Sequence, residues 1–219
     1  MSKNKNLPPL ECRNYTMELR AEKKEKDYII EGRPIVYNQV TNLGWCDEEI
    51  QSGALDSADL SDVRFLTNHD SKKIPLARSR KSSLNNTMTL SVDDKGLMIT
   101  VNLDVDNNAD ARALYSAVQR GDITGMSFMF GIDQCRWENL ESDHPTRVIE
   151  KISSVVEVSA VTFPAYEQTE IYARSKELLE NARKEMEIEK QKRAKSAEAD
   201  GDLELEKLKT LSILNLEVN

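Results

Sequence analysis

The 219-residue sequence predicts an α+β fold in which most strands are antiparallel, followed by a charged C-terminal tail. Three observations predict this. Short segments of alternating apolar and polar residues recur up to residue 163, with turn-forming residues between them. One stretch, 108–120, instead has apolar residues at helical spacing and stops at Gly121. Beyond Arg174 the composition changes to dense charge of both signs, with no proline.

Length and composition are those of one sizeable domain with an appendage. Hydrophobic residues make up 39% of the chain and charged residues 31%, which indicates a compact part and a solvated part. The 30 basic and 38 acidic residues give a net charge of −8, which argues against a general binder of nucleic acid or of anionic membranes. No apolar run approaches the roughly 20 residues of a membrane-spanning helix. The chain also begins without a secretory signal, so we expect a soluble intracellular protein.

The N-terminal part predicts a loose arm and a first hairpin. Residues 1–16 are polar and contain two consecutive prolines, so we expect an arm with little fixed structure. Strand-like segments at 15–20 and 27–37 flank a charged turn and predict the hairpin. For 47–55 we expect irregular chain or a short helix, and 56–62 contains several capping residues for a second helical turn.

The strands that follow are indicated more strongly. We expect them at 62–70, 88–92, 97–105, 125–132 and 148–163. The first ends in Asn-His-Asp and leads into a polar loop, and strand ends with their loops are where rigid scaffolds present chemistry. The second and third form a hairpin with Gly96 in its turn.

The strand expected at 125–132 carries a small hydroxyl at a position where the local pattern would bury a larger side chain. Alternation puts Phe128, Phe130 and Ile132 on one face, which we expect to anchor the strand in the core. Ser127 lies on the opposite face, next to two glycines that allow backbone or a ligand to approach closely.

Glu157 interrupts an otherwise apolar strand, and a buried carboxylate is costly unless it is paired or hydrogen-bonded. His69 is one candidate partner, and an arginine or lysine of a neighbouring strand is another. If His69 is the partner, the carboxylate fixes its tautomer and leaves the other ring nitrogen to take a proton from a hydroxyl such as that of Ser127. A histidine before aspartate is usually a loop or capping residue, a serine in a strand is usually a small polar neighbour, and Glu157 could lie on the exposed face of an edge strand.

Other catalytic arrangements have less support. His144, the second of the two histidines, lies beside Pro145 in an acidic, loop-like segment and competes as the base or the third member. Cys135 with a histidine is a further alternative, although the three cysteines form no C-x-x-C pattern and are interpreted as reduced thiols. The chain has no phosphate-binding glycine loop, no H-E-x-x-H motif and no G-x-S-x-G elbow, so we expect no cofactor and no metal.

Four motifs occur along the chain in this order: EIQSGAL at 49–55, FLTNHD at 65–70, GDITGMSFMF at 121–130 and EVSAVTFPAY at 157–166. Together they resemble the tailed-phage prohead proteases, which are capsid-maturation serine proteases with a fold similar to that of herpesvirus assemblin. The resemblance covers about residues 17–173.

This resemblance implies a small, mostly antiparallel β-barrel flanked by helices. It divides the chain into a flexible arm (1–16), a protease domain (17–173) and a charged helical or disordered tail (174–219). The implied activity is that of a serine endopeptidase that works inside the assembling procapsid, in the host cytoplasm. Its implied substrates are scaffold segments and extensions of the major capsid protein. Self-processing and self-association are also implied, but no nucleic-acid or membrane partner.

Carried over motif by motif, the resemblance assigns the catalytic histidine to His69, the nucleophile to Ser127 and the acidic member to Glu157. In assemblin-like proteases a second histidine takes the third role, so the glutamate is a departure from that pattern. Two other readings stay open: a non-catalytic capsid-assembly protein on the same fold, and an unrelated binding module in which the three side chains are not neighbours.

Overall fold

The computed structural model describes residues 10–16, 19–24, 26–162, 179–188 and 190–191. The chain divides into two compact units, Met1–Tyr172 and Ala173–Asn219. The strands all belong to the first unit, and the described residues of the second are helical. No helix in these ranges is long and apolar enough to cross a membrane.

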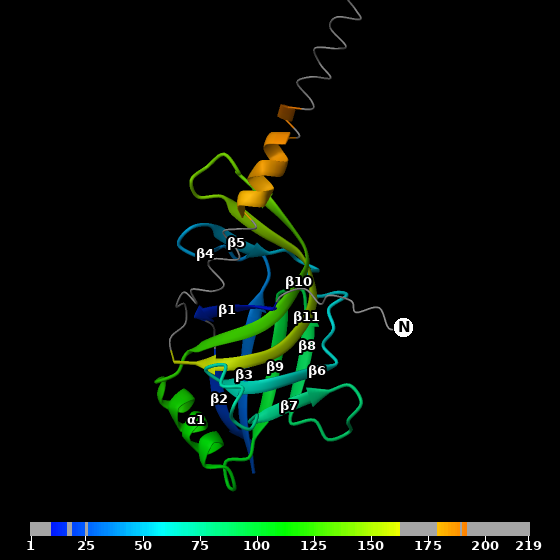
Figure 1. Ribbon diagram of the computed structural model, residues 1–219. Helices are drawn as coiled ribbons and strands as arrows, with labels where there is room; N and C mark the ends of the chain where they lie inside the picture. Colours follow the sequence, from blue (N-terminus) through cyan, green and yellow to red (C-terminus); the bar gives the residue numbers. More distant parts are fainter. Residues whose placement is uncertain (1–9, 17–18, 25, 163–178, 189, 192–219) are drawn as a thin grey trace, which may run out of the picture. The chain divides into compact units, whose positions relative to one another are not determined.

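The strands of the first unit form two sheets (Figure 1). Sheet A has the strand order β1-β10-β11-β5-β4, and β6 pairs with both β11 and β7. Its strands are β1 (Leu10–Thr16), β4 (Thr41–Asn42), β5 (Asp47–Ile50), β6 (Asp62–Thr67), β7 (Ala77–Arg80), β10 (Gly125–Glu138) and β11 (Thr146–Val161). Sheet B has the order β2-β3-β9-β8 and consists of β2 (Leu19–Lys24), β3 (Asp27–Val36), β8 (Met88–Asp93) and β9 (Gly96–Leu103). The pairs are antiparallel except those of β11 with β5 and β6, which are parallel.

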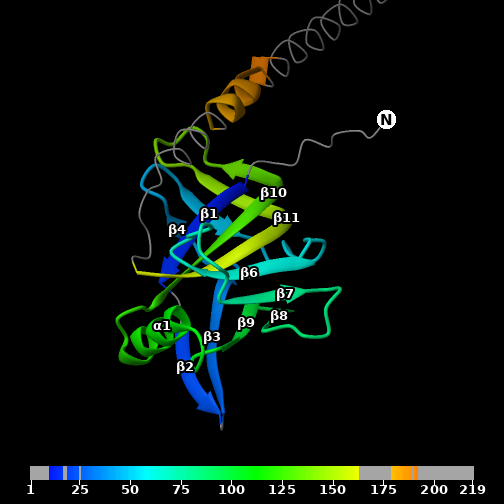
Figure 2. The ribbon, with the colours of Figure 1, turned by 60° about the horizontal axis from the view of Figure 1, so that its bottom comes forward.

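The strands of sheet B cross behind those of sheet A, and side chains from both sheets share one core cluster (Figures 1 and 2). Sheet B contributes Ile30 and Val101, among others, to this cluster, and β10 contributes Phe128 and Phe130. Both phenylalanines are fully buried, and burying a side chain of this size stabilises the fold by about 1.5–3 kcal/mol. The alternation expected for β10 is therefore confirmed, and it fixes which face of the sheet carries Ser127.

Helix α1 (Ala109–Arg120) leads directly into β10. The side chain of Asn108 accepts hydrogen bonds from the backbone N–H groups of Asp110 and Ala111, which caps the N-terminus. At the C-terminus Gly121 adopts a left-handed conformation with φ of 80°, which glycine tolerates best. The predicted helix is thus confirmed within one residue at its start, and its end sets where β10 begins.

Several expectations are corrected. Residues 10–16, expected in a loose arm, form β1, and 47–50, expected to be irregular or helical, form β5. Residues 52–57 form turns rather than helix. Phe163 of the expected last strand lies outside the described residues.

A closed barrel is not seen in the described part of the chain. Arg78 of β7 and Thr87, just before β8, do bond: the Thr87 N–H donates to the Arg78 carbonyl at 3.2 Å. No strand ladder extends from this contact to join the two sheets within the described ranges. The mostly antiparallel β architecture with helices is therefore correct, and the barrel is not confirmed.

Candidate active site

Three neighbouring strands bring Ser127, His69 and Glu157 together. On β10 and β11, Ser127 lies opposite Ser159, and opposed residues of antiparallel strands project to the same face. β6 runs parallel to β11 and ends at Thr67, so that His69 follows it in the adjoining loop. Residues widely separated in the sequence thus meet on the face of sheet A that is turned away from Phe128.

A β-bulge turns Glu157 towards this face. The register between β10 and β11 shifts between Met129, which pairs with Glu157, and Phe130, which pairs with Val155. The extra residue, Val156, makes both Val155 and Val158 core residues although they are three positions apart. Without the bulge, strict alternation from Val155 would direct the carboxylate of Glu157 into the apolar core.

The His69 ring lies between the other two side chains. Its Nε2 is 2.5 Å from the Ser127 Oγ, and its Nδ1 contacts a carboxylate oxygen of Glu157. A carboxylate only accepts hydrogen bonds, so we assign the ring proton to Nδ1 and leave Nε2 to accept from the serine hydroxyl. Glu157 is only 4% exposed, and this ring contact partners its buried charge.

The backbone at His69 has an uncommon conformation. Asn68 and His69 have φ of 51° and 57°, the left-handed region that costs non-glycine residues roughly 1–3 kcal/mol. Asn68 is held by two side-chain hydrogen bonds to Thr162: its Oδ1 accepts from the backbone N–H at 2.9 Å, and its Nδ2 donates to the Oγ1 at 3.1 Å. These contacts fix the loop so that the imidazole is directed back across the sheet.

Ser159 was not identified from the sequence, yet its hydroxyl contacts two parts of the site. It donates to the second carboxylate oxygen of Glu157 at 2.8 Å and accepts from the His69 backbone N–H at 3.1 Å. One hydroxyl therefore positions both the carboxylate and the histidine loop. Its position two residues after Glu157, on the same face of a strand, is the signal that could have revealed it.

Strand β1 covers the serine. Asn14 of β1 pairs with Ser127 of β10, and the hydroxyl of Ser127 donates to the backbone carbonyl of Arg13 at 2.8 Å. Ser127 is 0% exposed. The hydroxyl has a single proton, so its bond to Arg13 competes with its bond to the His69 ring.

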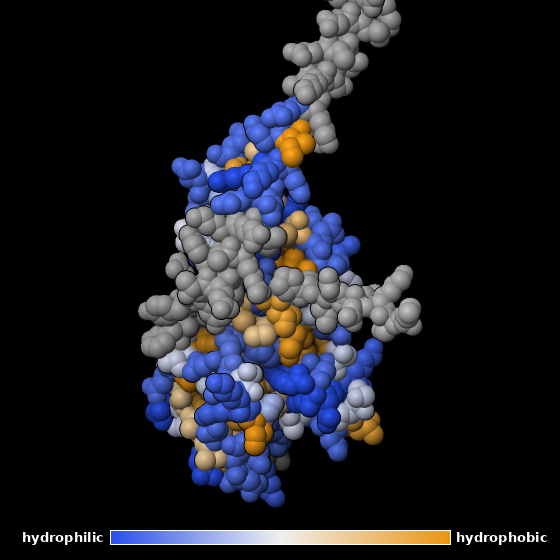
Figure 3. Space-filling view, viewed as in Figure 1, coloured by the Kyte–Doolittle hydropathy of each residue, from blue (hydrophilic) through white to orange (hydrophobic). Residues whose placement is uncertain are grey.

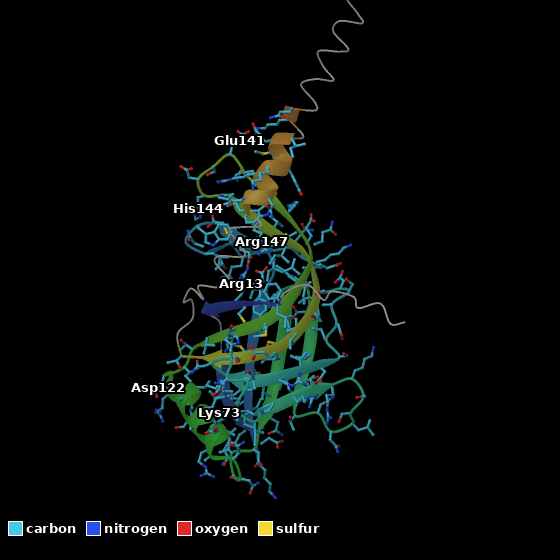
Figure 4. The ribbon with its side chains drawn as sticks, in the orientation of Figure 1. Arg13, Lys73, Asp122, Glu141, His144 and Arg147 are labelled. Carbon is cyan, nitrogen blue, oxygen red and sulfur yellow. The ribbon has the colours of Figure 1, made fainter. Side chains whose placement is uncertain are left out.

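Two residues of β1, Glu11 and Arg13, enter a buried ion cluster; Figure 4 labels its two arginines, Arg13 and Arg147. We call Glu11, Arg13, Glu48 and Arg147 the β1 ion cluster. The guanidinium of Arg13 bonds both carboxylate oxygens of Glu48, one of them at 2.6 Å, and that of Arg147 bonds Glu11 at 2.9 and 3.1 Å. All four residues are buried.

The charges of the β1 ion cluster compensate one another. Burial alone would raise the pKa of Glu11, but the charges and hydrogen bonds of Arg13 and Arg147 outweigh it and lower that pKa below its ordinary value. For Arg147, burial acts to lower the pKa, and the two carboxylates reverse this and raise it. Residues of β5 and β11 thus hold β1 in place electrostatically.

The competing candidates lie elsewhere. His144, labelled in Figure 4, contacts Asn42 of β4 at 3.4 Å and an Asp47 carboxylate oxygen of β5 at 3.0 Å. It precedes the start of β11, whereas Ser127 pairs with Ser159 near the end of that strand.

Cys135, the cysteine alternative, lies on β10 eight residues beyond Ser127 and pairs with Ile149. Of the other two cysteines, burial, and then the charge of Glu157, raises the pKa of the Cys12 thiol to about 11, and burial, and then Glu48, raises that of Cys46 to about 12. The described ranges contain no group of three or more His, Cys, Asp and Glu residues placed to bind a metal ion.

A cavity of about 270 Å³ adjoins the histidine loop. Leu66, Leu76 and Leu114 form part of its apolar lining, and Asp70 lies at the loop side. The face of the molecule drawn in Figure 3 is mainly hydrophilic, with small groups of hydrophobic residues.

The family model of the caudovirus prohead serine proteases matches residues 15–185 of the chain. The chain belongs to this family. Ser127, His69 and Glu157 of this prohead protease family member all lie inside the matched residues, whereas 10–14 of β1 precede them.

Two known proteins are similar to this family member. The prohead protease of Enterobacteria phage HK97 is 28% identical over 151 residues, which are 68% of this chain and 60% of that protein. The match thus spans less than two thirds of the relative. The structure of the bacteriophage T4 capsid assembly protease aligns with a TM-score of 0.43 and 11% identity, over 73% of this chain and all of that one.

Proposed function

We propose that this chain is a serine endopeptidase that cleaves scaffold segments and capsid-protein extensions inside the procapsid during head maturation, and that it also processes itself. One observation carries the proposal: the His69 ring contacts Ser127 through Nε2 and Glu157 through Nδ1. With a hydroxyl at one ring nitrogen and a carboxylate at the other, the imidazole is placed to act as a general base. The protease domain (17–173) and its relation to the herpesvirus assemblin fold are part of this proposal.

In the proposed reaction Ser127 Oγ attacks the scissile carbonyl carbon while Nε2 of His69 takes the hydroxyl proton. The imidazolium then gives that proton to the leaving amine, the peptide bond breaks, and an acyl ester remains on Ser127. A water molecule, deprotonated by the same Nε2, then attacks the ester carbonyl; the bond to Ser127 Oγ breaks, the acid product leaves, and the imidazolium returns the proton to Oγ. Glu157 stabilises the imidazolium in both halves, and Ser159 holds the carboxylate in place as a positioning residue.

The family and the name of one relative support the proposed setting. The HK97 relative is named a prohead protease. We therefore place this chain in the assembling procapsid, in the host cytoplasm, with major capsid protein and scaffold as protein substrates. Self-association of the chain in the procapsid belongs to the same proposal.

A non-catalytic assembly role is the second candidate, and one observation favours it. Ser127 is fully buried under β1, and a nucleophile without access to solvent meets no substrate. The two candidates differ in whether β1 leaves the serine.

Intact-mass time courses on the wild type and on Ser127→Ala, alone and mixed with the cognate capsid and scaffold proteins, test the proposal. We expect discrete fragments from the wild type and none from Ser127→Ala. Ser91→Ala, which changes an exposed serine of β8, is the matched control and should cleave like the wild type. Equal cleavage by wild type and Ser127→Ala would show that Ser127 is not the nucleophile. No cleavage by either protein would favour the assembly role.

A further inference from the structure

Strand β1 is the terminal strand of sheet A on the path through β10, the strand that carries Ser127. An extended peptide that adds to a sheet edge is a common way of binding a substrate or partner strand. We infer that the β10 edge is the substrate-binding site, that β1 occupies it in place of a substrate, and that the β1 ion cluster selects an acidic-x-basic sequence. This inference rests on the proposed function.

The backbone of β1 is placed as a substrate strand would be. Seven register pairs run from Leu10 opposite Gly131 to Thr16 opposite Gly125, with Ser127 near the middle. The carbonyl oxygen of Arg13 is the one that reaches the Ser127 hydroxyl, at 2.8 Å. The peptide bond presented to the nucleophile is therefore Arg13–Asn14.

The side chains of β1 define what the edge accepts. Arg13 contributes the presented carbonyl, and its guanidinium bonds both oxygens of the fully buried Glu48. Two residues earlier, Glu11 takes both terminal nitrogens of the buried Arg147. Glu48 and Arg147 also approach each other at 3.5 Å, so β5 and β11 keep a paired acid and base when β1 is absent. Such a pair fits an incoming strand with a basic residue at the scissile carbonyl and an acidic residue two positions before it.

Strand β1 also affects the chemistry directly. While the single hydroxyl proton of Ser127 is donated to Arg13, it is not available to Nε2 of His69. While β1 is paired with β10, it therefore keeps a substrate from reaching Ser127 and accepts the hydroxyl proton that His69 would otherwise take. The family match begins at residue 15, so most of the blocking strand lies outside the part of the chain that the family model covers.

A reversible crosslink tests whether β1 must leave. Cys12 of β1 is the register partner of Met129, so Met129→Cys places two cysteines opposite each other. We expect oxidation of this full-length variant to reduce its hydrolysis of a quenched peptide by at least about tenfold, and reduction to restore it, because a bound ligand strand and β1 exclude each other. Met129→Cys combined with Cys12→Ser is the matched control, and it should hydrolyse the peptide at the same rate under oxidising and reducing conditions.

A peptide series tests the selectivity. Full-length enzyme should hydrolyse a peptide containing Glu-x-Arg after the arginine, and replacing that arginine by glutamine should lower kcat/KM by about 10- to 100-fold, as expected for losing a bidentate charged contact. Glu48→Gln should largely remove the difference between the two peptides. If that variant does not fold, the peptide series on the wild type still decides.

The outcomes separate the inference from the proposed function. Equal hydrolysis by the oxidised and reduced crosslinkable variant, failure of the crosslink to form, or equal rates for the two peptides would overturn the inference while leaving a protease. A product that begins at Asn14 would support it, because β1 would then have been cut in the register seen here. No hydrolysis by any variant, in either redox state, would overturn the proposed function and the inference with it.

Discussion

Ser159→Ala is the substitution that best tests how the site is held together. The Ser159 hydroxyl donates to Glu157 at 2.8 Å and accepts from the His69 backbone N–H at 3.1 Å. The alanine variant removes both bonds without touching Ser127. It leaves a carboxylate with one partner fewer and a backbone N–H without this acceptor, in a site where Ser159 itself is fully buried.

The structure gives the size of the expected effects. A hydrogen bond to a charged group contributes about 1.5–3 kcal/mol and a neutral one about 0.5–1.5 kcal/mol, so the free energy of unfolding should fall by about 2–4 kcal/mol. Displacement of a catalytic base by an ångström can cost about 100-fold, so kcat should fall by about 10- to 100-fold with a smaller change in KM. Ser159→Thr keeps the hydroxyl and should recover most of the rate.

Urea unfolding and peptide hydrolysis measure the two effects. The matched control is Ser153→Ala on the same strand, because the buried Ser153 hydroxyl has no hydrogen-bond partner among the described residues, and its removal should change neither the rate nor the stability by much. If Ser159→Ala kept the wild-type rate while losing stability, the hydroxyl would be structural only. If it lost neither, the two hydrogen bonds would contribute nothing.

Three further predictions concern the histidine loop, the β1 ion cluster and the thiols. Asn68→Ala should lose about 1–2 kcal/mol of unfolding free energy and much of kcat, because its bonds to Thr162 and its tolerance of left-handed φ disappear; unchanged values in both assays would contradict this. Glu11 has a pKa below its ordinary 4.5, so its stabilisation is present above that value and is lost as pH falls through the lower folded pKa. Wild type should therefore lose more stability on acidification than Glu11→Gln, and parallel unfolding curves for the two would refute this. Since burial raises the pKa of Cys12 to about 11 and of Cys46 to about 12, iodoacetamide at neutral pH should leave hydrolysis unchanged, and inactivation in step with alkylation would indicate a cysteine nucleophile.

The sequence was most informative where the spacing of apolar residues along one segment determines its secondary structure. Alternation in 125–132 correctly placed Phe128 in the core and Ser127 on the opposite face, and the spacing in 108–120 predicted α1. The interruption of an apolar strand by Glu157 correctly signalled a buried carboxylate that needs a partner.

What the sequence could not indicate depends on contacts between distant residues. β1 is polar and was expected to be loose, but Arg13 pairs with a glutamate 35 positions away and Glu11 with an arginine 136 positions away. β5 is short and acidic and becomes a strand through its pairing with β11 and β4. The bulge at Val156, which turns Glu157 to the site, leaves no local signal in a run of apolar residues.

The central claim is that His69 activates Ser127, and a fluorophosphonate probe tests it most directly. Full-length wild type and His69→Ala are incubated with the probe, and the modified residue and its rate of modification are determined by mass spectrometry. We expect one adduct per chain, on Ser127, and a rate at least about 100-fold lower in His69→Ala, the usual contribution of a positioned general base. An adduct on another residue, or equal labelling of Ser127 in both proteins, would contradict the account.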